Sequence, residues 1–193
     1  MKIFGLTGGI GSGKSTIAKI FEVMSVPVYY SDDRAKALYY LPDVKQKVVQ
    51  LLGENAYFLN GQLNKKYISE AIFSNIELLH KINEIIHPAV DVDFNQWKKN
   101  QKSSFVLKEA AILFETGIYK KLDATILVVC PEKLRIERVC KRDGISAEDV
   151  KKRIDKQFSD NKKSELANWV IKNDDENSLI KQCVELHKKL AFC

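Results

Sequence analysis

Eight consecutive residues near the start of the chain constrain its fold more than any others. Residues 8–15, Gly-Gly-Ile-Gly-Ser-Gly-Lys-Ser, fit the pattern G-x-x-x-x-G-K-[ST] in full. The apolar segment 2–6 before them predicts a strand, and apolar residues recur at helical spacing over 17–24. A glycine-rich turn between a strand and a helix is the setting in which main-chain N–H groups and a helix N-terminus hold phosphate. The segment therefore predicts a nucleotide-phosphate cradle in an α/β protein.

The residues of this loop predict specific contacts with a nucleotide. Lys14 can reach the β- and γ-phosphates, and the Ser15 hydroxyl is suited to bind Mg²⁺. Glycines let main-chain N–H groups turn toward phosphate oxygens without a Cβ in the way. We therefore expect ATP and Mg²⁺ as cofactors, with ATP bound by Gly8, Gly9, Gly11, Ser12, Gly13, Lys14, Ser15 and Thr16.

The rest of the chain alternates strand and helix patterns around one long helical block. A second apolar strand over 26–30 completes a strand–helix–strand unit, which is typical of a parallel sheet. Residues 32–101 carry mainly helical periodicity, and strands return at 104–108, 124–129 and 169–171. Helices are expected over 132–142, 147–157 and 176–190. The predicted fold class is an α/β P-loop fold, in which helices flank a parallel sheet.

These patterns divide the 193 residues into three parts. The helical block 32–101 is predicted to be an inserted substrate-binding domain. The helices of 132–165 are predicted to form a lid. The nucleotide-binding core then comprises residues 1–31, 102–131 and 166–193.

Composition argues against several other classes of protein. The net charge is +6, but the lysine pairs are spread along the chain, which argues against a nucleic-acid partner. The apolar runs are strand-sized and no signal peptide is present, so we expect a cytoplasmic protein without membrane contact. The spacing of the four cysteines favours neither zinc nor disulfides: Cys130, Cys140, Cys183 and Cys193.

Two acidic residues follow the second predicted strand. A carboxylate at Asp32 or Asp33 would lie in the crevice where open α/β sheets bind ligands. There it can accept a proton from an attacking hydroxyl, or bind Mg²⁺ through a water molecule. The same residues also suit the first turn of a helix. The spacing alone leaves both interpretations open.

Three arginines share one predicted helix after the strand 124–129. The spacing of Arg135, Arg138 and Arg142 places them on roughly one face. Arginines on a mobile segment can stabilise charge on a phosphoryl group, which fits a lid of a small-molecule kinase. The alternative is a solvated face on which glutamates are their partners.

Two further positions leave alternatives open. His87 precedes Pro88 and fits either packing at a helix kink or a functional contact. Glu109 and Glu115 flank an apolar segment and fit either ligand contacts or a loop acid and a helix cap.

Taken together, these segments resemble the dephospho-coenzyme A kinase family over nearly the whole chain. The segment 5–15 is similar to the family's P-loop, and Tyr30-Ser31-Asp32 falls on its Asp-Ala-Asp motif. Its Leu-x-x-Ile-x-His-Pro segment ends on Pro88. The chain departs from the family pattern at Tyr30, Ala111, Ile112 and Asn168. Residues 111–115 fall on the family's Pro-Leu-Leu-Phe-Glu segment, residues 138–143 on its Arg-x-x-x-Arg-Asp lid segment, and residues 167–173 on its Ala-Asp-x-Val-Ile-x-Asn segment. Ala35-Lys36 falls where the family tends to have Ala-Arg, and Gln157 falls on a lid Gln.

The resemblance implies ATP-dependent phosphorylation of the ribose 3′-hydroxyl of dephospho-coenzyme A, the last step of coenzyme A biosynthesis. It implies that Asp32 is the catalytic carboxylate, because the first Asp of the motif is Tyr30 here. Lys14, Arg138 and Arg142 would complete the catalytic set. The substrate, bound by a monomer or weak homo-oligomer, would contact Asp32, His87, Leu113 and Glu115.

Three other functions compete with this one. Another small-molecule or nucleoside monophosphate kinase would share the P-loop. A regulatory GTPase would need Asn-Lys-x-Asp, and both Asn64-Lys65-Lys66-Tyr67 and Asn161-Lys162-Lys163-Ser164 lack the Asp. A nucleic-acid-binding NTPase would bind DNA or RNA with steep salt dependence.

Overall fold

The computed structural model describes residues 1–192, apart from the side chains of Phe73 and Ser74. Cys193, one of the four cysteines, therefore lies outside the described residues. The chain forms two compact units, Met1–Tyr30 with Gln101–Cys193 and Ser31–Asn100. Within the described part of the chain, no helix has the length and apolar character needed to cross a membrane.

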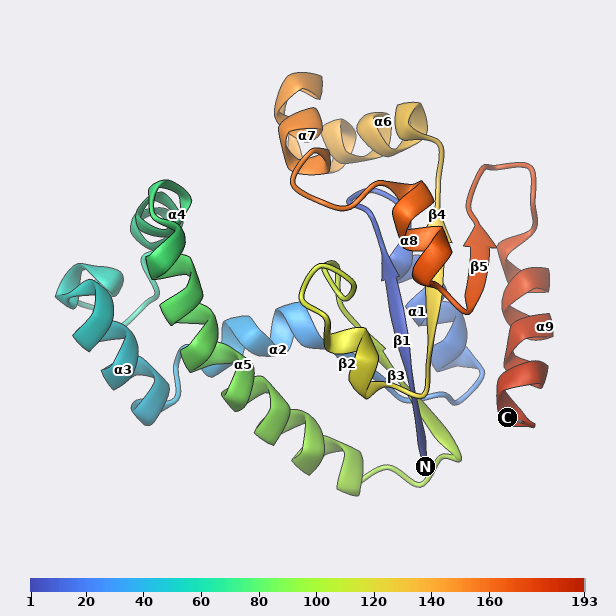
Figure 1. Cartoon of the computed structure of the whole chain (residues 1–193), viewed down its shortest axis with the longest axis horizontal. Helices are drawn as coiled ribbons and strands as arrows, with labels where there is room; N and C mark the ends of the chain where they lie inside the picture. The colour runs from blue at the N-terminus through green and yellow to red at the C-terminus, as the bar shows by residue number, and fades with distance from the viewer. Residues whose placement is uncertain (193) are drawn as a thin grey trace. The chain divides into compact units, whose positions relative to one another are not determined.

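The first unit is built on a five-stranded sheet whose strand order is β2-β3-β1-β4-β5. Every pairing is parallel, with Phe4 opposite Leu107 on one side of β1 and opposite Ala124 on the other (Figure 1). The parallel sheet predicted from the sequence is thereby confirmed. The strands are β1 (Lys2–Gly8), β2 (Val28–Tyr30), β3 (Phe105–Glu109), β4 (Ala124–Val129) and β5 (Trp169–Lys172).

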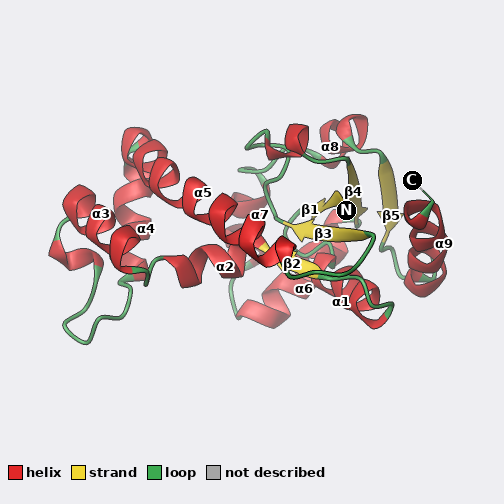
Figure 2. Cartoon of the chain, turned by 90° about the horizontal axis from the view of Figure 1, so that it is seen from below, coloured by secondary structure: helices red, strands yellow, loops and turns green. Residues whose placement is uncertain are grey.

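Helices cover both faces of this sheet. On one face, α1 (Lys14–Val23) and α9 (Leu179–Ala191) contact each other and bury their apolar sides against the strands. On the opposite face, α8 (Asp160–Leu166) lies against β4 (Figure 2). The sequence analysis missed α8 because its residues, Asp-Asn-Lys-Lys-Ser-Glu-Leu, carry no apolar period. It starts at the N-cap Ser159, whose side chain accepts a hydrogen bond from the Lys162 N–H.

Two helices follow β4 and occupy the predicted lid region. Helix α6 (Glu132–Asp143) ends at Gly144, which has a φ of 66°, and α7 (Ala147–Ile154) starts after the N-cap Ser146. The second helix is shorter than the sequence predicted, since it ends at Ile154 rather than Gln157. A single 3₁₀ turn, η2 (Ile118–Lys121), links the loop after β3 to β4.

The second unit is helical, as its periodicity predicts. Its longest helix continues through Pro88. The contacts that join its elements include Tyr57 Oη, which donates to the Tyr39 carbonyl at 2.7 Å, Tyr67 Oη, which donates to the Leu52 carbonyl at 2.8 Å, and the pair of Arg34 with Asp93. The elements are α2 (Ser31–Leu38), α3 (Pro42–Leu52), η1 (Glu54–Ala56), α4 (Lys65–Ser74) and α5 (Ile76–Lys99).

Candidate active site

The glycine-rich loop runs from the end of β1 to the start of α1. Gly11 and Gly13 have φ values of 76° and 91°, a region that residues with a Cβ rarely adopt. The Ser12 N–H donates to the Gly9 carbonyl at 3.1 Å and closes the turn. The first N–H groups of α1 then point out of the helix end, as in a phosphate cradle.

Asn173 packs against this cradle from the end of β5. A Cβ on Gly13 would lie 2.1 Å from Asn173 Nδ2, so a larger residue at position 13 would collide with the amide as well as strain the backbone. The same Nδ2 donates to the Ser12 carbonyl at 2.8 Å, and the Asn173 N–H donates to the Val129 carbonyl. Asn173 therefore connects the loop to β4 and β5.

The polar side chains of the loop suit a bound anion. Lys14 Nζ donates to the Gly8 carbonyl at 3.0 Å, which keeps the ammonium group beside the loop. Ser12 Oγ is buried and has no hydrogen-bond partner among the described residues. A buried hydroxyl without a partner, in a glycine-rich turn, is suited to donate a hydrogen bond to an oxygen atom of a bound nucleotide phosphate.

Arg135 contacts the loop from α6 and is only 5% exposed. Its Nε donates to the Ile10 carbonyl at 3.0 Å, and its Nη1 pairs with Asp160 at 3.2 Å. On the other side, the Ile10 N–H donates to Gln157 Oε1 at 2.9 Å. The solvated-face interpretation is therefore wrong for Arg135.

Arg138 and Arg142 lie farther along α6 and are paired with carboxylates. Arg138 pairs with Asp175 at 2.6 Å and also donates to Cys130 Sγ. Arg142 makes two hydrogen bonds to Asp143, at 2.7 and 2.9 Å. This pair raises the pKa of Arg142 and lowers the pKa of Asp143, chiefly through the hydrogen bonds between them. Both guanidinium groups thus bind oxyanions.

Glu115 and Leu113 follow β3, and both have contacts inside the first unit. Glu115 Oε1 accepts a hydrogen bond from the Phe158 N–H at 2.9 Å and lies 3.1 Å from Lys163 Nζ. Lys163 is fully buried, and so is Leu113. Glu115 therefore anchors α8, which the sequence analysis did not predict.

The predicted residues of the second unit lie on its surface. Asp32 and Asp33 are exposed in the first turn of α2, which begins directly after β2. The helix-start interpretation is consistent with this placement. His87 is exposed on α5, next to Pro88.

Comparison with known proteins identifies the family. Residues 2–178 match the family model described as dephospho-CoA kinase. The chain belongs to the dephospho-CoA kinase family. It is 40% identical to a dephospho-CoA kinase of Bacteroides fragilis over 184 residues, which cover 94% of this chain and 89% of that protein.

Solved structures agree with this fold. The fold is similar to that of TT1252 from Thermus thermophilus, with a TM-score of 0.89, 28% identity and coverage of 97% and 96% of the two chains. It is also similar in fold to a dephospho-CoA kinase from Campylobacter jejuni, with a TM-score of 0.68, 24% identity and coverage of 98% and 96%. The family resemblance and the α/β P-loop fold predicted from the sequence are confirmed.

The members of the dephospho-CoA kinase family are enzymes. Dephospho-CoA kinases are phosphotransferases that phosphorylate dephospho-CoA with ATP, in the biosynthesis of coenzyme A. The kinase, its nucleotide substrate and its small-molecule acceptor, all predicted from the sequence, are confirmed.

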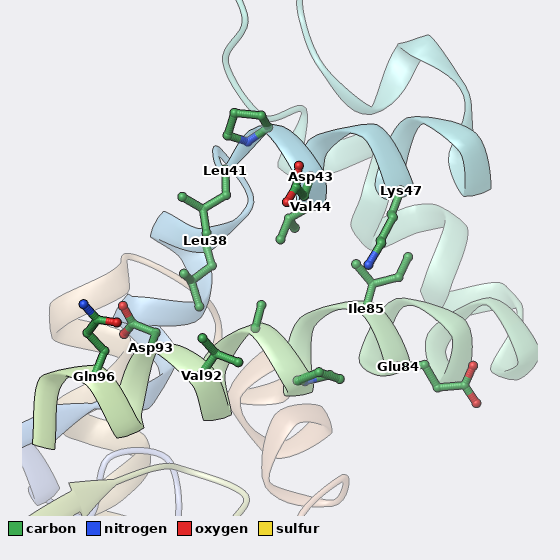
Figure 3. A pocket seen from close by; sticks show the side chains of 13 residues that line it. Leu38, Leu41, Asp43, Val44, Lys47, Glu84, Ile85, Val92, Asp93 and Gln96 are labelled. Carbon is green, nitrogen blue, oxygen red and sulfur yellow. The ribbon is translucent and has the colours of Figure 1, made fainter. Parts of the chain in front are cut away.

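The helical unit of this dephospho-CoA kinase contains a pocket of about 660 Å³ between α2, α3 and α5. Figure 3 shows Leu38, Val44 and Ile85 facing it, with Lys47 and Asp93 near them. Pro88 is among its lining residues and His87 is not. The residues that the resemblance assigned to the acceptor, Asp32, His87, Leu113 and Glu115, are not among those that line this pocket.

Sequence reasoning overlooked four side chains at the nucleotide loop and α8 of this kinase. Gln157 and Asn173 matched the family pattern, but the pattern alone assigned them no contact with the loop. Arg135 was grouped with Arg138 and Arg142, with a lid role and a solvated face both left open, and Lys163 was counted among the dispersed lysine pairs, although both side chains are buried. One signal in the sequence pointed to these four residues: each lies in, or close to, a segment that matches the family pattern.

Proposed function

We propose that this chain transfers the γ-phosphoryl group of ATP to the ribose 3′-hydroxyl of dephospho-CoA, giving coenzyme A and ADP. The observation that carries the proposal is the glycine-rich loop of residues 8–15 in a chain of this family. A hydrogen bond closes the turn of this loop, and the buried Ser12 hydroxyl has no hydrogen-bond partner among the described residues. Phosphoryl transfer depends on positioning and charge neutralisation more than on covalent chemistry.

The nucleotide would be held by the loop and by the start of α1. Main-chain N–H groups of Gly11 and of residues 13–15 would donate to the phosphates, and Lys14 would leave the Gly8 carbonyl for the β- and γ-phosphate oxygens. Ser15 would bind Mg²⁺, which neutralises phosphate charge when bound. Among the described residues no three His, Cys, Asp or Glu side chains cluster as a metal site, so the other ligands would be phosphate and water oxygens.

Asp32 would act on the acceptor. It is exposed at the start of α2, where its carboxylate can accept a hydrogen bond from a hydroxyl group. In this role it would orient the 3′-hydroxyl and take its proton, and a water-mediated contact with Mg²⁺ is a second role for the same carboxylate.

Arg138 and Arg142 would exchange carboxylate partners for phosphate. Each now binds an aspartate, and a phosphate offers the same kind of oxygens with more charge. The lid formed by residues 132–165 would bring them to the reacting group and exclude water, which competes as an acceptor.

The acceptor itself would be bound mainly by the second unit. His87, exposed on α5, is suited to contact a phosphate of dephospho-CoA, and Leu113 and Glu115 would shape the site through the loop after β3. We further expect the enzyme to work in the cytoplasm, as a monomer or weak homo-oligomer, without nucleic-acid or membrane partners.

A single assay tests the assignment. The purified chain is incubated with ATP, Mg²⁺ and dephospho-CoA, and coenzyme A is measured by mass. The expected result is coenzyme A in equimolar amount with ADP, and loss of product on removal of Mg²⁺ by a chelator. A panel of shikimate, nucleosides and nucleoside monophosphates serves as the comparison. Phosphorylation of one of these in place of dephospho-CoA would overturn the proposed function.

A further inference from the structure

The peptide groups on both sides of Ile10 are held by side chains from the two ends of the lid. The Ile10 carbonyl accepts a hydrogen bond from Arg135 Nε at 3.0 Å, and the Ile10 N–H donates to Gln157 Oε1 at 2.9 Å. Arg135 lies on α6, near the start of the predicted lid 132–165, and Gln157 follows α7, toward the end of the lid. Figure 1 shows this return path from α7 toward α8.

An ion pair fixes Arg135 in this position. Its Nη1 lies 3.2 Å from Asp160 Oδ2, in the first turn of α8, and the side chain is 5% exposed. A buried guanidinium group must have such partners, because its burial without them would cost several kcal/mol. The contact is close on the loop side too, since a Cβ on Gly9 would lie 2.3 Å from Arg135 Nη2.

The glycines beside Ile10 explain why hydrogen bonds from other parts of the chain are needed to order this loop. Gly9 and Gly11 flank it, and residues without a Cβ leave the peptide groups around Ile10 free to rotate in an isolated chain. A loop that must be ordered during binding loses affinity, whereas a loop ordered beforehand does not. Arg135 and Gln157 supply this order through hydrogen bonds that span 125 and 147 residues of sequence.

We propose that Arg135 and Gln157 are positioning residues for ATP, which hold the Ile10 main chain so that the phosphate-binding N–H groups keep their orientation. Asp160 secures Arg135, so both ends of the lid contribute to ATP affinity. The inference rests on the proposed function of residues 8–15 as the ATP site. Neither residue needs to touch ATP or the acceptor.

Four variants test the role of these side chains. Arg135→Met removes the hydrogen bond and the ion pair but keeps an unbranched side chain, and Arg135→Lys keeps a positive charge for Asp160. Gln157→Leu removes the acceptor for the Ile10 N–H at a half-buried position. Lys133→Met, an exposed position on the same helix, is the matched control. The ATP Kd is measured by calorimetry without acceptor, and KM is measured for both substrates.

We expect Arg135→Met and Gln157→Leu to raise the ATP Kd and the KM for ATP about tenfold each, as for a lost hydrogen bond to a charged or well-ordered group. The KM for dephospho-CoA should change less than about twofold, Arg135→Lys should recover part of the ATP affinity, and Lys133→Met should match the wild type. Because both side chains hold one residue, the double variant should lose less than the product of the single losses.

The proposal is overturned if folded Arg135→Met and Gln157→Leu bind ATP as tightly as the wild type. It is equally overturned if KM rises in parallel for both substrates, because that would mean a general loss of structure. If Arg135→Met does not fold, Gln157→Leu and Arg135→Lys decide the question. A wild-type chain that binds ATP but makes no coenzyme A would refute the proposed function and leave the calorimetric test of this inference intact.

Discussion

The two units use their long-range polar contacts differently. In the sheet unit, Arg135 and Asn173 donate hydrogen bonds to the short loop between β1 and α1, and Gln157 accepts one from it. In the helical unit, the contacts of Tyr57, Tyr67 and Arg34 join elements to one another. The contacts of the sheet unit order the glycine-rich loop. The contacts of the helical unit hold its helices together, and its predicted acceptor residues lie exposed on its surface.

This difference indicates a division of labour in the kinase. The proposed nucleotide site is ordered by its own unit, which would reduce the conformational entropy lost when ATP binds. Asp32 and His87, which we propose act on the acceptor, are exposed side chains. Changes in the sheet unit should therefore alter ATP binding and stability, and changes at Asp32 should alter turnover.

The largest effect is expected at Lys14, in the sheet unit. Lys14→Ala removes the cation that would neutralise the transferring phosphoryl group, so kcat should fall about 10³-fold. The fold should be retained, because Lys14 is half-buried at the loop and is not one of the residues of the buried hydrophobic core. Steady-state kinetics and circular dichroism measure the two quantities, and Lys19→Ala, exposed on the same helix, is the control.

Asp32→Asn tests the helical unit's part in catalysis. The amide cannot take the proton of the acceptor hydroxyl, so kcat should fall about 10²-fold or more while the ATP Kd stays unchanged. Asp33→Asn changes a neighbouring exposed carboxylate that is paired with Lys36, and it should retain activity. Near wild-type turnover in Asp32→Asn would leave only the helix-start role for this residue.

Glu115→Ala should cost stability in the sheet unit. It leaves fully buried Lys163 without its carboxylate, which should lower the free energy of unfolding by about 3 kcal/mol. Glu115→Gln with Lys163→Met should recover most of that loss, because no buried charge remains. Denaturant unfolding measures both variants, and Glu148→Ala, which breaks the exposed pair with Lys152, should change stability by less than about 0.5 kcal/mol.

Arg142→Met is expected to have a smaller effect on catalysis. It would remove the proposed charge-assisted contact to phosphate, so kcat should fall about tenfold with little change in stability. Arg153 also lies near Asp143, at 3.5 Å, and Arg153→Met is the control. Equal losses in the two variants would show that lid charge in general matters, and not Arg142 in particular.

The smallest effect concerns the core of the sheet unit at high pH. Burial raises the pKa of Cys183 from 9.0 to about 11. Because the folded protein favours the neutral thiol, this contribution to stability is fully present below pH 9 and is lost as the pH rises through 11. Cys183→Val should therefore lose less stability than the wild type across that interval, as measured by urea unfolding. Identical pH profiles would contradict the buried neutral thiol.

Local patterns predicted much of this molecule. Residues 8–15, the apolar strands and the helical block 32–101 are read from neighbours in the sequence, and strand β4 lies where its apolar run predicted. The helix predicted over 147–157 ends at Ile154, and Gln157 beyond it accepts a hydrogen bond from the Ile10 N–H. Helix α8 was missed, because its polar residues form a helix that is stabilised by Glu115 and β4 rather than by an apolar face of its own.

The sequence by itself determined the phosphate loop, the parallel sheet and the kinase family, since motif spacing and periodicity express them locally. Only the tertiary structure decided that Arg135 is buried against Ile10, that Asn173 packs on Gly13, and that Lys163 pairs with Glu115. The contacts to the loop join residues more than a hundred positions apart, 161 in the case of Asn173 and Ser12. No local pattern encodes such a pairing, because it depends on how the sheet brings the ends of β1, β4 and β5 together.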